Sequence, residues 1–173
     1  MNRLPLMVSI LGWSGTGKTT FVEACIAECA GRGIAAAAVK KSRHEAGLPP
    51  GTKDSARFRA AGASTSIYLS EKEMVILAAP PSPTDAKGIA ALCPGASIIF
   101  CEGLELPGCP LVLVAGAGME ESALKRPLSS IDILIAREPA MLKLALSRRI
   151  KAFQPGETGL FIDHLISMEE QDA

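Results

Sequence analysis

The chain has 173 residues, close to the size of one ordinary domain, and at this length about two thirds of its surface can be buried without metals or disulfides. Lys and Arg together number 18, as do Asp and Glu, so the net charge argues against a general nucleic-acid or membrane-surface binder. No apolar run approaches the roughly 20 residues that a membrane span needs. We therefore predict one domain, covering residues 1–173, that binds neither nucleic acid nor membrane.

The five cysteines are odd in number and scattered, with no C-x-x-C pair and no secretory leader. This usage predicts reduced thiols in a soluble, cytoplasmic protein. Cys25 and Cys29 share a helix face at a spacing that a metal could use, but no nearby residues complete a set of four ligands.

Apolar segments of strand length alternate with helical segments along the chain. In chain order, we predict strands at residues 4–11, 34–39, 66–69, 74–78, 96–101, 111–114 and 131–136, and helices at residues 19–31, 53–61 and 138–150, with a further helix starting at residues 82–85. Continuous Val, Ile, Leu and Ala strands separated by helices are typical of a parallel sheet that is covered on both faces. The predicted fold class is α/β, a doubly wound, mostly parallel sheet in a three-layer sandwich.

A glycine-rich motif follows the first predicted strand directly. Residues 12–20 read G-W-S-G-T-G-K-T-T, a complete G-x-x-x-x-G-K-[ST]. The glycines let successive N–H groups surround a polyphosphate, while Lys18 reaches the outer phosphates and the Thr19 hydroxyl ligates Mg²⁺. The sequence therefore predicts a P-loop NTPase-like fold with a phosphate site formed by Gly12, Ser14, Gly15, Thr16, Gly17, Lys18, Thr19 and Thr20.

An acidic residue ends a later apolar strand. Glu102 follows four apolar residues and precedes Gly103, at the carboxyl edge where open α/β sheets bind ligands. A P-loop needs such a carboxylate to hold the Mg²⁺ shell. We take Thr19 and Glu102 as the candidate metal residues and Lys18 and Glu102 as the candidate catalytic residues; a surface turn is the alternative explanation for Glu102.

Positive charge gathers between residues 40 and 59. This stretch holds six cations and two anions, a local charge of +4: Lys40, Lys41, Arg43, Lys53, Arg57 and Arg59 against Glu45 and Asp54. It leaves the carboxyl end of the second predicted strand and so lies beside the expected phosphate site. Either an anion binds there or the segment is a solvated basic loop.

Several motifs in this order resemble the MobB family, the molybdopterin-guanine dinucleotide biosynthesis adaptor proteins. They are the P-loop, His44 after the second strand, the Lys53-Asp54-Ser55 segment with Arg57 and Ala61-Gly62-Ala63, and Cys101-Glu102-Gly103-Leu104. The likeness runs in proper order and spacing from about residue 4 to residue 106.

The resemblance implies a Mg²⁺-dependent GTP-binding protein, a slow GTPase at most, that assists attachment of the guanine nucleotide to molybdopterin. It also implies a MobA transferase or another molybdopterin-handling protein as partner, and a homodimer. By position, Gly15, Gly17, Lys18 and Thr19 would hold phosphates and metal, with Glu102 as the acid on the Mg²⁺ side. His44, Lys53 and Asp54 would form a segment that responds to the nucleotide or faces a partner.

The sequence departs from the family pattern in two places. Where the family usually carries several aspartates after the histidine, this chain has Glu45, Gly47 and Pro49, which weakens the case for hydrolysis by this loop. No Asn-Lys-x-Asp motif is present to select guanine. Glu138 is the candidate acid for the base, because a carboxylate accepts from guanine N1 and N2; an acid at a helix start, near the positive end of the dipole, is the alternative explanation.

Two other functions remain open from the sequence. A P-loop small-molecule kinase would need a lid that brings arginines over the phosphates, a role open to Arg57 and Arg59. A non-hydrolysing adaptor that uses the nucleotide only to set its shape is favoured by the single carboxylate after His44.

Overall fold

The computed structural model describes residues 4–42 and 52–171. The chain divides into two compact units, which we describe separately: Met1–Lys41 with Asp85–Ala173, called here the core unit, and Ser42–Thr84, called the small unit. The single domain over residues 1–173 stays a prediction.

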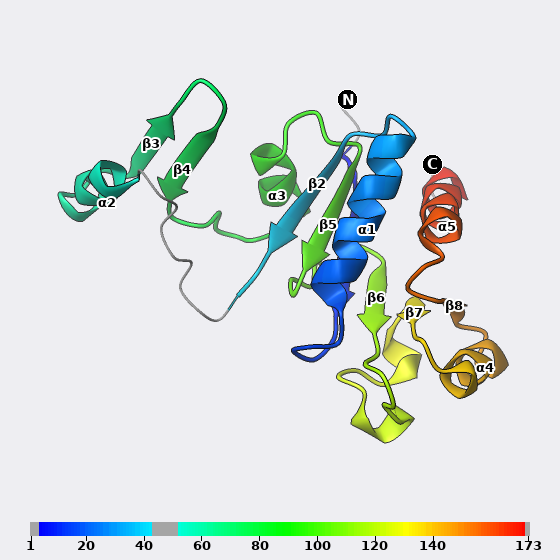
Figure 1. Cartoon of the computed structure of the whole chain (residues 1–173). Helices are drawn as coiled ribbons and strands as arrows, with labels where there is room; N and C mark the ends of the chain where they lie inside the picture. Colours follow the sequence, from blue (N-terminus) through cyan, green and yellow to red (C-terminus); the bar gives the residue numbers. More distant parts are fainter. Residues whose placement is uncertain (1–3, 43–51, 172–173) are drawn as a thin grey trace. The chain divides into compact units, whose positions relative to one another are not determined.

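The core unit is built on a six-stranded parallel sheet (Figure 1). Its strands are β1 (Leu6–Leu11), β2 (Ala36–Lys40), β5 (Ile98–Glu102), β6 (Leu111–Val114), β7 (Ile133–Ile135) and β8 (Lys151–Phe153). They lie in the order β2-β5-β1-β6-β7-β8, and every neighbouring pair is parallel. Among its described residues, four α-helices accompany the sheet: α1 (Lys18–Gly31), α3 (Ala86–Leu92), α4 (Pro139–Ser147) and α5 (Thr158–Gln171). The predicted fold class is thereby confirmed.

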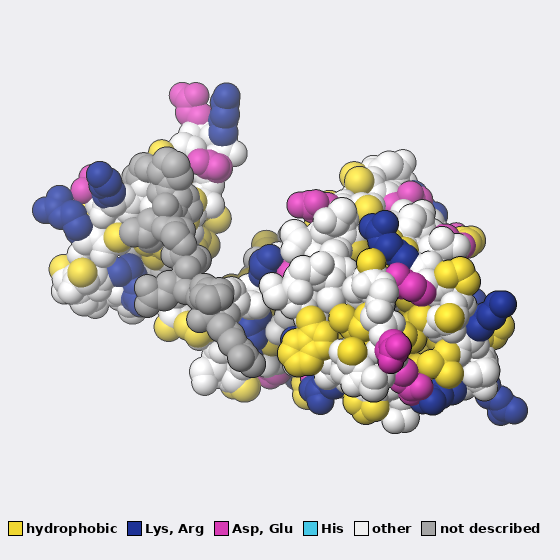
Figure 2. Space-filling model, turned by 60° about the horizontal axis from the view of Figure 1, so that its bottom comes forward, with side chains coloured by type: hydrophobic (Ala, Val, Ile, Leu, Met, Phe, Trp, Pro, Cys, Tyr) yellow, Lys and Arg dark blue, Asp and Glu magenta, His cyan; other side chains and the backbone are white. Residues whose placement is uncertain are grey.

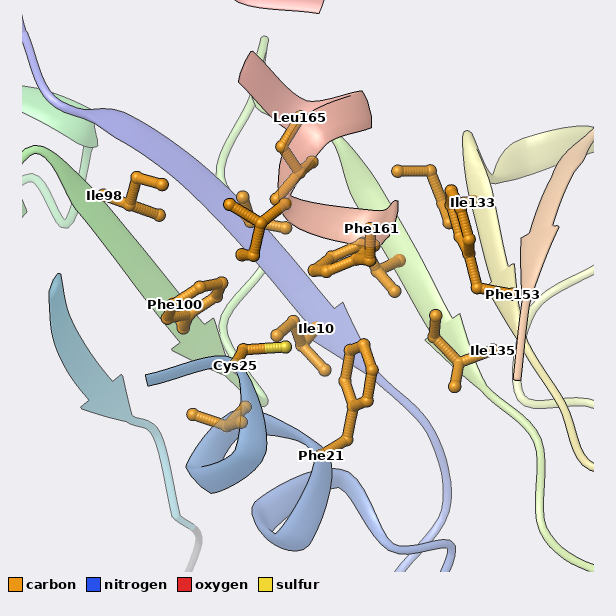
Figure 3. Close-up of a cluster of buried hydrophobic side chains, with 14 of the residues drawn as sticks. Ile10, Phe21, Cys25, Ile98, Phe100, Ile133, Ile135, Phe153, Phe161 and Leu165 are labelled. Atoms are coloured by element: carbon orange, nitrogen blue, oxygen red, sulfur yellow. The ribbon is translucent and has the colours of Figure 1, made fainter. Parts of the chain in front are cut away.

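One face of the sheet packs against α1 and α5. Alternate residues of β1, such as Val8 and Ile10, are fully buried in this cluster together with Phe21 of α1 and Phe161 of α5. Figure 3 shows Phe161 and Phe21 pointing toward the strands. The two rings meet edge to face with centroids 5.1 Å apart, a favoured aromatic geometry.

The opposite face holds two further clusters. Met7 of β1 and Ile99 of β5 pack with Ile89 of α3, and Leu113 and Leu134 pack in a cluster that includes residues of α4. The central strands β1, β5, β6 and β7 are therefore buried on both faces, which is why they read as continuous apolar runs in the sequence.

The two free cysteines of α1 belong to the packed core. Cys25 and Cys29 are fully buried, and burial raises the pKa of the Cys25 thiol to about 12. In residues 4–42 and 52–171, no group of three His, Cys, Asp or Glu side chains is placed to hold a metal ion. The two thiols therefore act as small apolar groups.

The small unit corrects one expectation. The strands predicted at residues 66–69 and 74–78 form no part of the parallel sheet; β3 (Thr65–Leu69) and β4 (Met74–Ala78) pair antiparallel as a separate two-stranded sheet. α2 (Lys53–Ala60) contacts both strands. Only four residues separate the strands, which suits a hairpin but not a parallel crossover.

One face of the hairpin is apolar and exposed. Ile67 pairs with Ile76, and Leu69 pairs with Met74. More than half of the surface of each of these four side chains is exposed. Figure 2 shows hydrophobic surface and Lys or Arg side chains together on the small unit, on the left of the view. We call these four residues the hairpin face.

The predicted helix at residues 138–150 is too long. α4 ends at Ser147, Arg149 has a positive φ of 61°, and the chain then enters β8. This edge strand of three residues was missed because it is short and begins with Lys151, whose charge, with that of Arg148 and Arg149, resembles the basic end of a helix.

The helices give no sign of a membrane span. In the part of the chain that the structure describes, every helix is too short or too polar to cross a bilayer.

The aromatic contact of α5 gives a test of the fold. We expect Phe161→Ala to lower the free energy of unfolding by about 3–5 kcal/mol, because it leaves a cavity among fully buried side chains. Leu160→Ala is the control, since Leu160 is next to it on α5 but 59% exposed. Urea unfolding measures both. A loss at Phe161 no larger than that at Leu160 would contradict the assignment of α5 to the core.

Candidate functional site

The glycine-rich loop joins β1 to α1 at the middle of the sheet. Gly12 lies so close to β6 that an added Cβ would stand 2.5 Å from the Val114 carbonyl oxygen, so no larger residue fits there. Gly17 takes a left-handed conformation, with φ at 89°, and leads directly into Lys18 at the start of α1. The first turn of α1 contains no acidic residue. The positive end of the helix dipole is therefore free to face an anion.

Side chains within the loop converge on one carbonyl. Lys18 Nζ donates to the Trp13 carbonyl oxygen at 2.6 Å, and Thr16 Oγ1 donates to the same oxygen at 3.0 Å. These contacts hold the loop curved and fix the position of the Lys18 ammonium group beside it. Burial lowers the pKa of Lys18, and the positive charges of Lys125 and Lys40 act in the same direction, while Glu102 opposes them.

The carboxylate at the end of β5 meets the start of α1. Thr19 Oγ1 lies 3.0 Å from Glu102 Oε1 and 2.9 Å from Oε2. Parallel register places Glu102 beside Ile10 of β1 on one side and beside Lys40 of β2 on the other. Lys40 Nζ lies 3.2 Å from Glu102 Oε1 and 3.2 Å from Thr19 Oγ1. A hydroxyl, a carboxylate and an ammonium thus share one small site.

A cavity of about 340 Å³ contains these groups. It is lined by Ser14, Gly15, Gly17, Lys18, Thr19, Thr20, Lys40 and Glu102. The hydroxyl and carboxylate oxygens are the hard donors that Mg²⁺ prefers, and they converge at one point of the wall, so the residues present fit such an ion. Two lysines and the exposed loop amides make the remainder suitable for an anion.

A second cavity, of about 480 Å³, opens on the other side of the loop. Thr16, Gly17 and Thr20 line it near the P-loop, and α1 and the end of β6 contribute Phe21, Ala24 and Val114. The segments after β6, β7 and β8 supply the rest: Ala115, Arg137, Gln154, Pro155 and Gly156. Sequence reasoning missed Arg137 and Gln154. Both follow the carboxyl ends of strands, so the strand-end rule could have found Gln154 had β8 been recognised.

Glu138 does not line that cavity. Its Oε1 accepts a hydrogen bond from the Gly118 N–H at 2.6 Å, which ties α4 to the loop after β6. Its Oε2 is buried and has no hydrogen-bond partner among the described residues. Glu138 stands directly before Pro139, the first residue of α4. A role for it toward the base stays a prediction.

Trp13 anchors the P-loop to the segment after β6, a contact that the sequence did not reveal. Trp13 Nε1 donates to the Ala123 carbonyl oxygen at 2.9 Å, next to a short 3₁₀ turn, η1 (Glu121–Ala123). Lys125 Nζ lies 3.3 Å from the Gly12 carbonyl oxygen and 5.8 Å from the centroid of the Trp13 ring. Lys125 therefore adds a cation beside the loop.

Two of the remaining predicted residues, Lys53 and Asp54, belong to the small unit. Lys53 and Asp54 lie in the first turn of α2, where Asp54 pairs with Arg57 at 3.3 Å. His44 lies outside the described residues. The roles of Lys53, Asp54 and His44 toward nucleotide or partner stay predictions.

A parallel sheet of this strand order, with a glycine-rich loop before α1 and an acid at the end of the adjacent strand, defines the class of P-loop α/β proteins. Residues 7–135 match the family model described as MobB, Molybdopterin guanine dinucleotide synthesis protein B. Because this match covers most of the chain, the protein belongs to the MobB family.

Individual relatives agree with this assignment. The chain is 27% identical over 151 residues to a molybdopterin-guanine dinucleotide biosynthesis adapter protein of Haemophilus influenzae, covering 86% of this chain and 82% of the relative. An adapter protein of Escherichia coli with the same name is 33% identical over 78 residues, 45% of this chain and 44% of the relative. The crystal structure of Bacillus subtilis MobB matches with a TM-score of 0.64 and 18% identity, covering 91% of this chain and 96% of that one, which shows the shared fold.

The glycine after Glu102 gives a test of how the acid is held. Gly103 has φ at +74°, and an added Cβ would lie 2.8 Å from the Lys41 carbonyl oxygen. Gly108 has nearly the same φ, +76°, but open space around it. We expect Gly103→Ala to destabilise the protein by about 1–3 kcal/mol more than Gly108→Ala, because only the first adds a clash to the left-handed strain. Urea unfolding compares the two; equal losses would show that the approach to Lys41 is unimportant.

Proposed function

We propose that the protein is a Mg²⁺-dependent GTP-binding adapter of molybdopterin-guanine dinucleotide biosynthesis. Family membership supports the pathway, and the names of both curated relatives describe adapters in it. The single observation that carries the nucleotide site is the meeting of Thr19 Oγ1 and the Glu102 carboxylate at 2.9–3.0 Å, inside a lysine-lined cavity.

In this proposal, the triphosphate lies against the loop amides and Lys18, with Mg²⁺ at Thr19 and Glu102. The phosphate-binding residues are those of the sequence prediction: Gly12, Ser14, Gly15, Thr16, Gly17, Lys18, Thr19 and Thr20. The metal supplies charge neutralisation and orientation of the phosphates when bound. A negative polyphosphate also relieves the mutual repulsion of Lys18, Lys40 and Lys125.

The base would enter the second cavity. This cavity begins at Thr16, Gly17 and Thr20 and so continues from the phosphate site. The Gln154 carboxamide there offers both a donor and an acceptor to the edge of a base. The choice of guanine rests on the molybdopterin-guanine dinucleotide named for the family and its relatives.

A binding role receives more support than rapid catalysis. Among the described residues that line the two cavities, Glu102 is the one carboxylate and there is no histidine. Because Glu102 is assigned to Mg²⁺, those residues include no second carboxylate and no imidazole to activate a water molecule. This favours a slow GTPase at most, or an adaptor that binds without hydrolysis, over a kinase. The lid arginines that a kinase would need are engaged within the small unit, Arg57 with Asp54 and Arg59 with the Ser64 carbonyl oxygen.

The partners follow from the adapter role. We propose that the protein acts in the cytoplasm, where its five free cysteines stay reduced, and contacts the MobA transferase or another molybdopterin-handling protein. Lys53 and Asp54 belong to the segment proposed to respond to nucleotide or face that partner.

We also propose a homodimer, formed through the hairpin face. The face consists of Ile67, Leu69, Met74 and Ile76, all more than half exposed. α2 contacts both strands but leaves this face exposed, so covering the face with a second copy would remove apolar surface from water and stabilise both hairpins. Burying each side chain contributes about 1.5–3 kcal/mol.

Nucleotide titration tests the main proposal. We expect the protein to bind a fluorescent GTP analogue in the presence of Mg²⁺ and to prefer GTP over ATP in competition. Lys18→Ala should abolish binding, because it removes an ammonium group from the lining of the cavity proposed to hold the phosphates. Lys87→Ala, at an exposed lysine outside both cavities, should bind as the wild type does. Equal affinity for GTP and ATP would sink the guanine assignment, and normal binding by Lys18→Ala would sink the phosphate site.

Glu102→Gln tests the metal side separately. The amide keeps the shape of the carboxylate but loses its charge, so nucleotide binding should persist while the stimulation by Mg²⁺ falls about tenfold or more. The same titration at several Mg²⁺ concentrations measures it. An unchanged Mg²⁺ dependence would remove Glu102 from the site.

Sedimentation velocity tests the homodimer. Leu69→Lys should shift the protein toward monomer and weaken association at least about tenfold, because it places a charge in the apolar contact. Leu146→Lys is the matched control: Leu146 is equally exposed but lies on α4 of the core unit. A wild-type monomer, or equal association of both variants, would contradict this interface.

A further inference from the structure

The ammonium of Lys40 stands where two metal-binding groups converge. Lys40 Nζ lies 3.2 Å from Thr19 Oγ1 and 3.2 Å from Glu102 Oε1, the same two groups to which we assign Mg²⁺. The Lys40 side chain is 60% exposed, whereas that of Glu102 is 10% exposed. The cation thus reaches in from the solvent side to a largely buried carboxylate.

The register of the sheet brings Lys40 and Glu102 together. Parallel register of β2 with β5 sets Lys40 directly beside Glu102 as the last residue of each strand, so the two side chains leave the same face of the sheet. The Lys41 N–H donates to the Glu102 carbonyl oxygen at 2.9 Å, which continues the pairing one residue further. The lysine is therefore held opposite the carboxylate by backbone pairing as well as by charge.

Lys40 and a divalent cation compete for the same lone pairs on the oxygens of Thr19 and Glu102. The Thr19 hydroxyl has one hydrogen and two lone pairs. Its hydrogen points to Glu102, and one lone pair accepts from Lys40. A metal ion bound by Thr19 and Glu102 needs these oxygen lone pairs at about 2 Å, and an ammonium left in contact with the same oxygens would repel it strongly.

We propose that Lys40 is the built-in counter-ion of the Glu102–Thr19 pair, which a divalent cation must displace in order to bind. Without metal, Lys40 neutralises Glu102 and leaves the cavity positive enough to accept a nucleotide. With metal, Lys40 leaves the pair, and part of the metal's binding free energy is used to move it. The proposal rests on the proposed nucleotide and metal site and adds to it the residue that sets its dependence on metal.

We expect the variant Lys40→Met to change the affinities for Mn²⁺ and for nucleotide in opposite directions. Removal of the competing charge should tighten Mn²⁺ binding to the nucleotide-free protein about tenfold. The electron paramagnetic resonance signal of free Mn²⁺ measures this affinity. The same variant should bind a fluorescent GTP analogue about tenfold more weakly in excess chelator, because the cavity has lost a cation. A variant that had lost part of its fold would bind both Mn²⁺ and the nucleotide more weakly, so it would not move the two affinities in opposite directions.

Two further variants serve as controls. Lys41→Met makes the same charge change one residue along the chain, on an exposed side chain outside the cavity, and should leave both affinities as in the wild type. Lys40→Arg keeps the positive charge and should retain weak Mn²⁺ binding. Thermal unfolding of each variant checks that it folds.

The outcomes separate this proposal from the one on which it rests. Equal Mn²⁺ affinities for the wild type and Lys40→Met, including no binding by either, would overturn the role of Lys40, as would equal effects of Lys40→Met and Lys41→Met. Failure of the wild type to bind any nucleotide would instead overturn the proposed function, while the Mn²⁺ titration would still decide whether Lys40 competes with a divalent cation.

Discussion

The parallel pairing of β5 with β1 is the constraint on which the site depends. It places Glu102 beside Ile10, two residues before the glycine-rich loop begins, so that the loop and α1 bring Thr19 back to the same carboxylate. A slip of one residue in this pairing would turn the carboxylate to the other face of the sheet. The register is secured by packing, because β1 and β5 are buried along their whole lengths on both faces. The chemistry of the cavity is therefore fixed by the apolar core beneath it.

Sequence reasoning succeeded where the signal is local and failed where residues meet through the fold. The spacing of Gly12, Gly17 and Lys18 is a local motif, and the fold class follows from strands that are apolar on both faces. The position of Glu102 at the end of β5 was predicted by a rule that concerns strand ends, which needs only the knowledge that the sheet is parallel, and its role as a site residue stays a prediction. By contrast, the sequence showed Lys40 only as one of several clustered cations. Its contact with Glu102 depends on the order of strands β2-β5-β1, which no local pattern predicts.

The hairpin shows why the sheet prediction was too inclusive. Its strands contain the same kinds of apolar residue as the core strands, but burial alternates along them. Ile67 and Leu69 are exposed, while Ser66, next to Ile67, is buried. Alternating burial of this kind is typical of an antiparallel sheet, and the four-residue connection between β3 and β4 is too short for a parallel crossover. The missed strand β8 is the converse case, since three residues carry too little pattern to distinguish a strand from a helix end.

The cations around the loop come from three separate parts of the core unit: Lys18 from α1, Lys40 from β2 and Lys125 from the segment after η1. Each is held by an oxygen of the chain, Lys18 and Lys125 by carbonyls of the loop and Lys40 by Glu102. Burial lowers the pKa of Lys18, and the charges of Lys125 and Lys40 act in the same direction. Because one carboxylate cannot balance three ammonium groups, the free energy of this arrangement falls when an anion of several charges enters. The same imbalance supports a polyphosphate, rather than a single carboxylate or a neutral ligand, as the proposed occupant of the cavity.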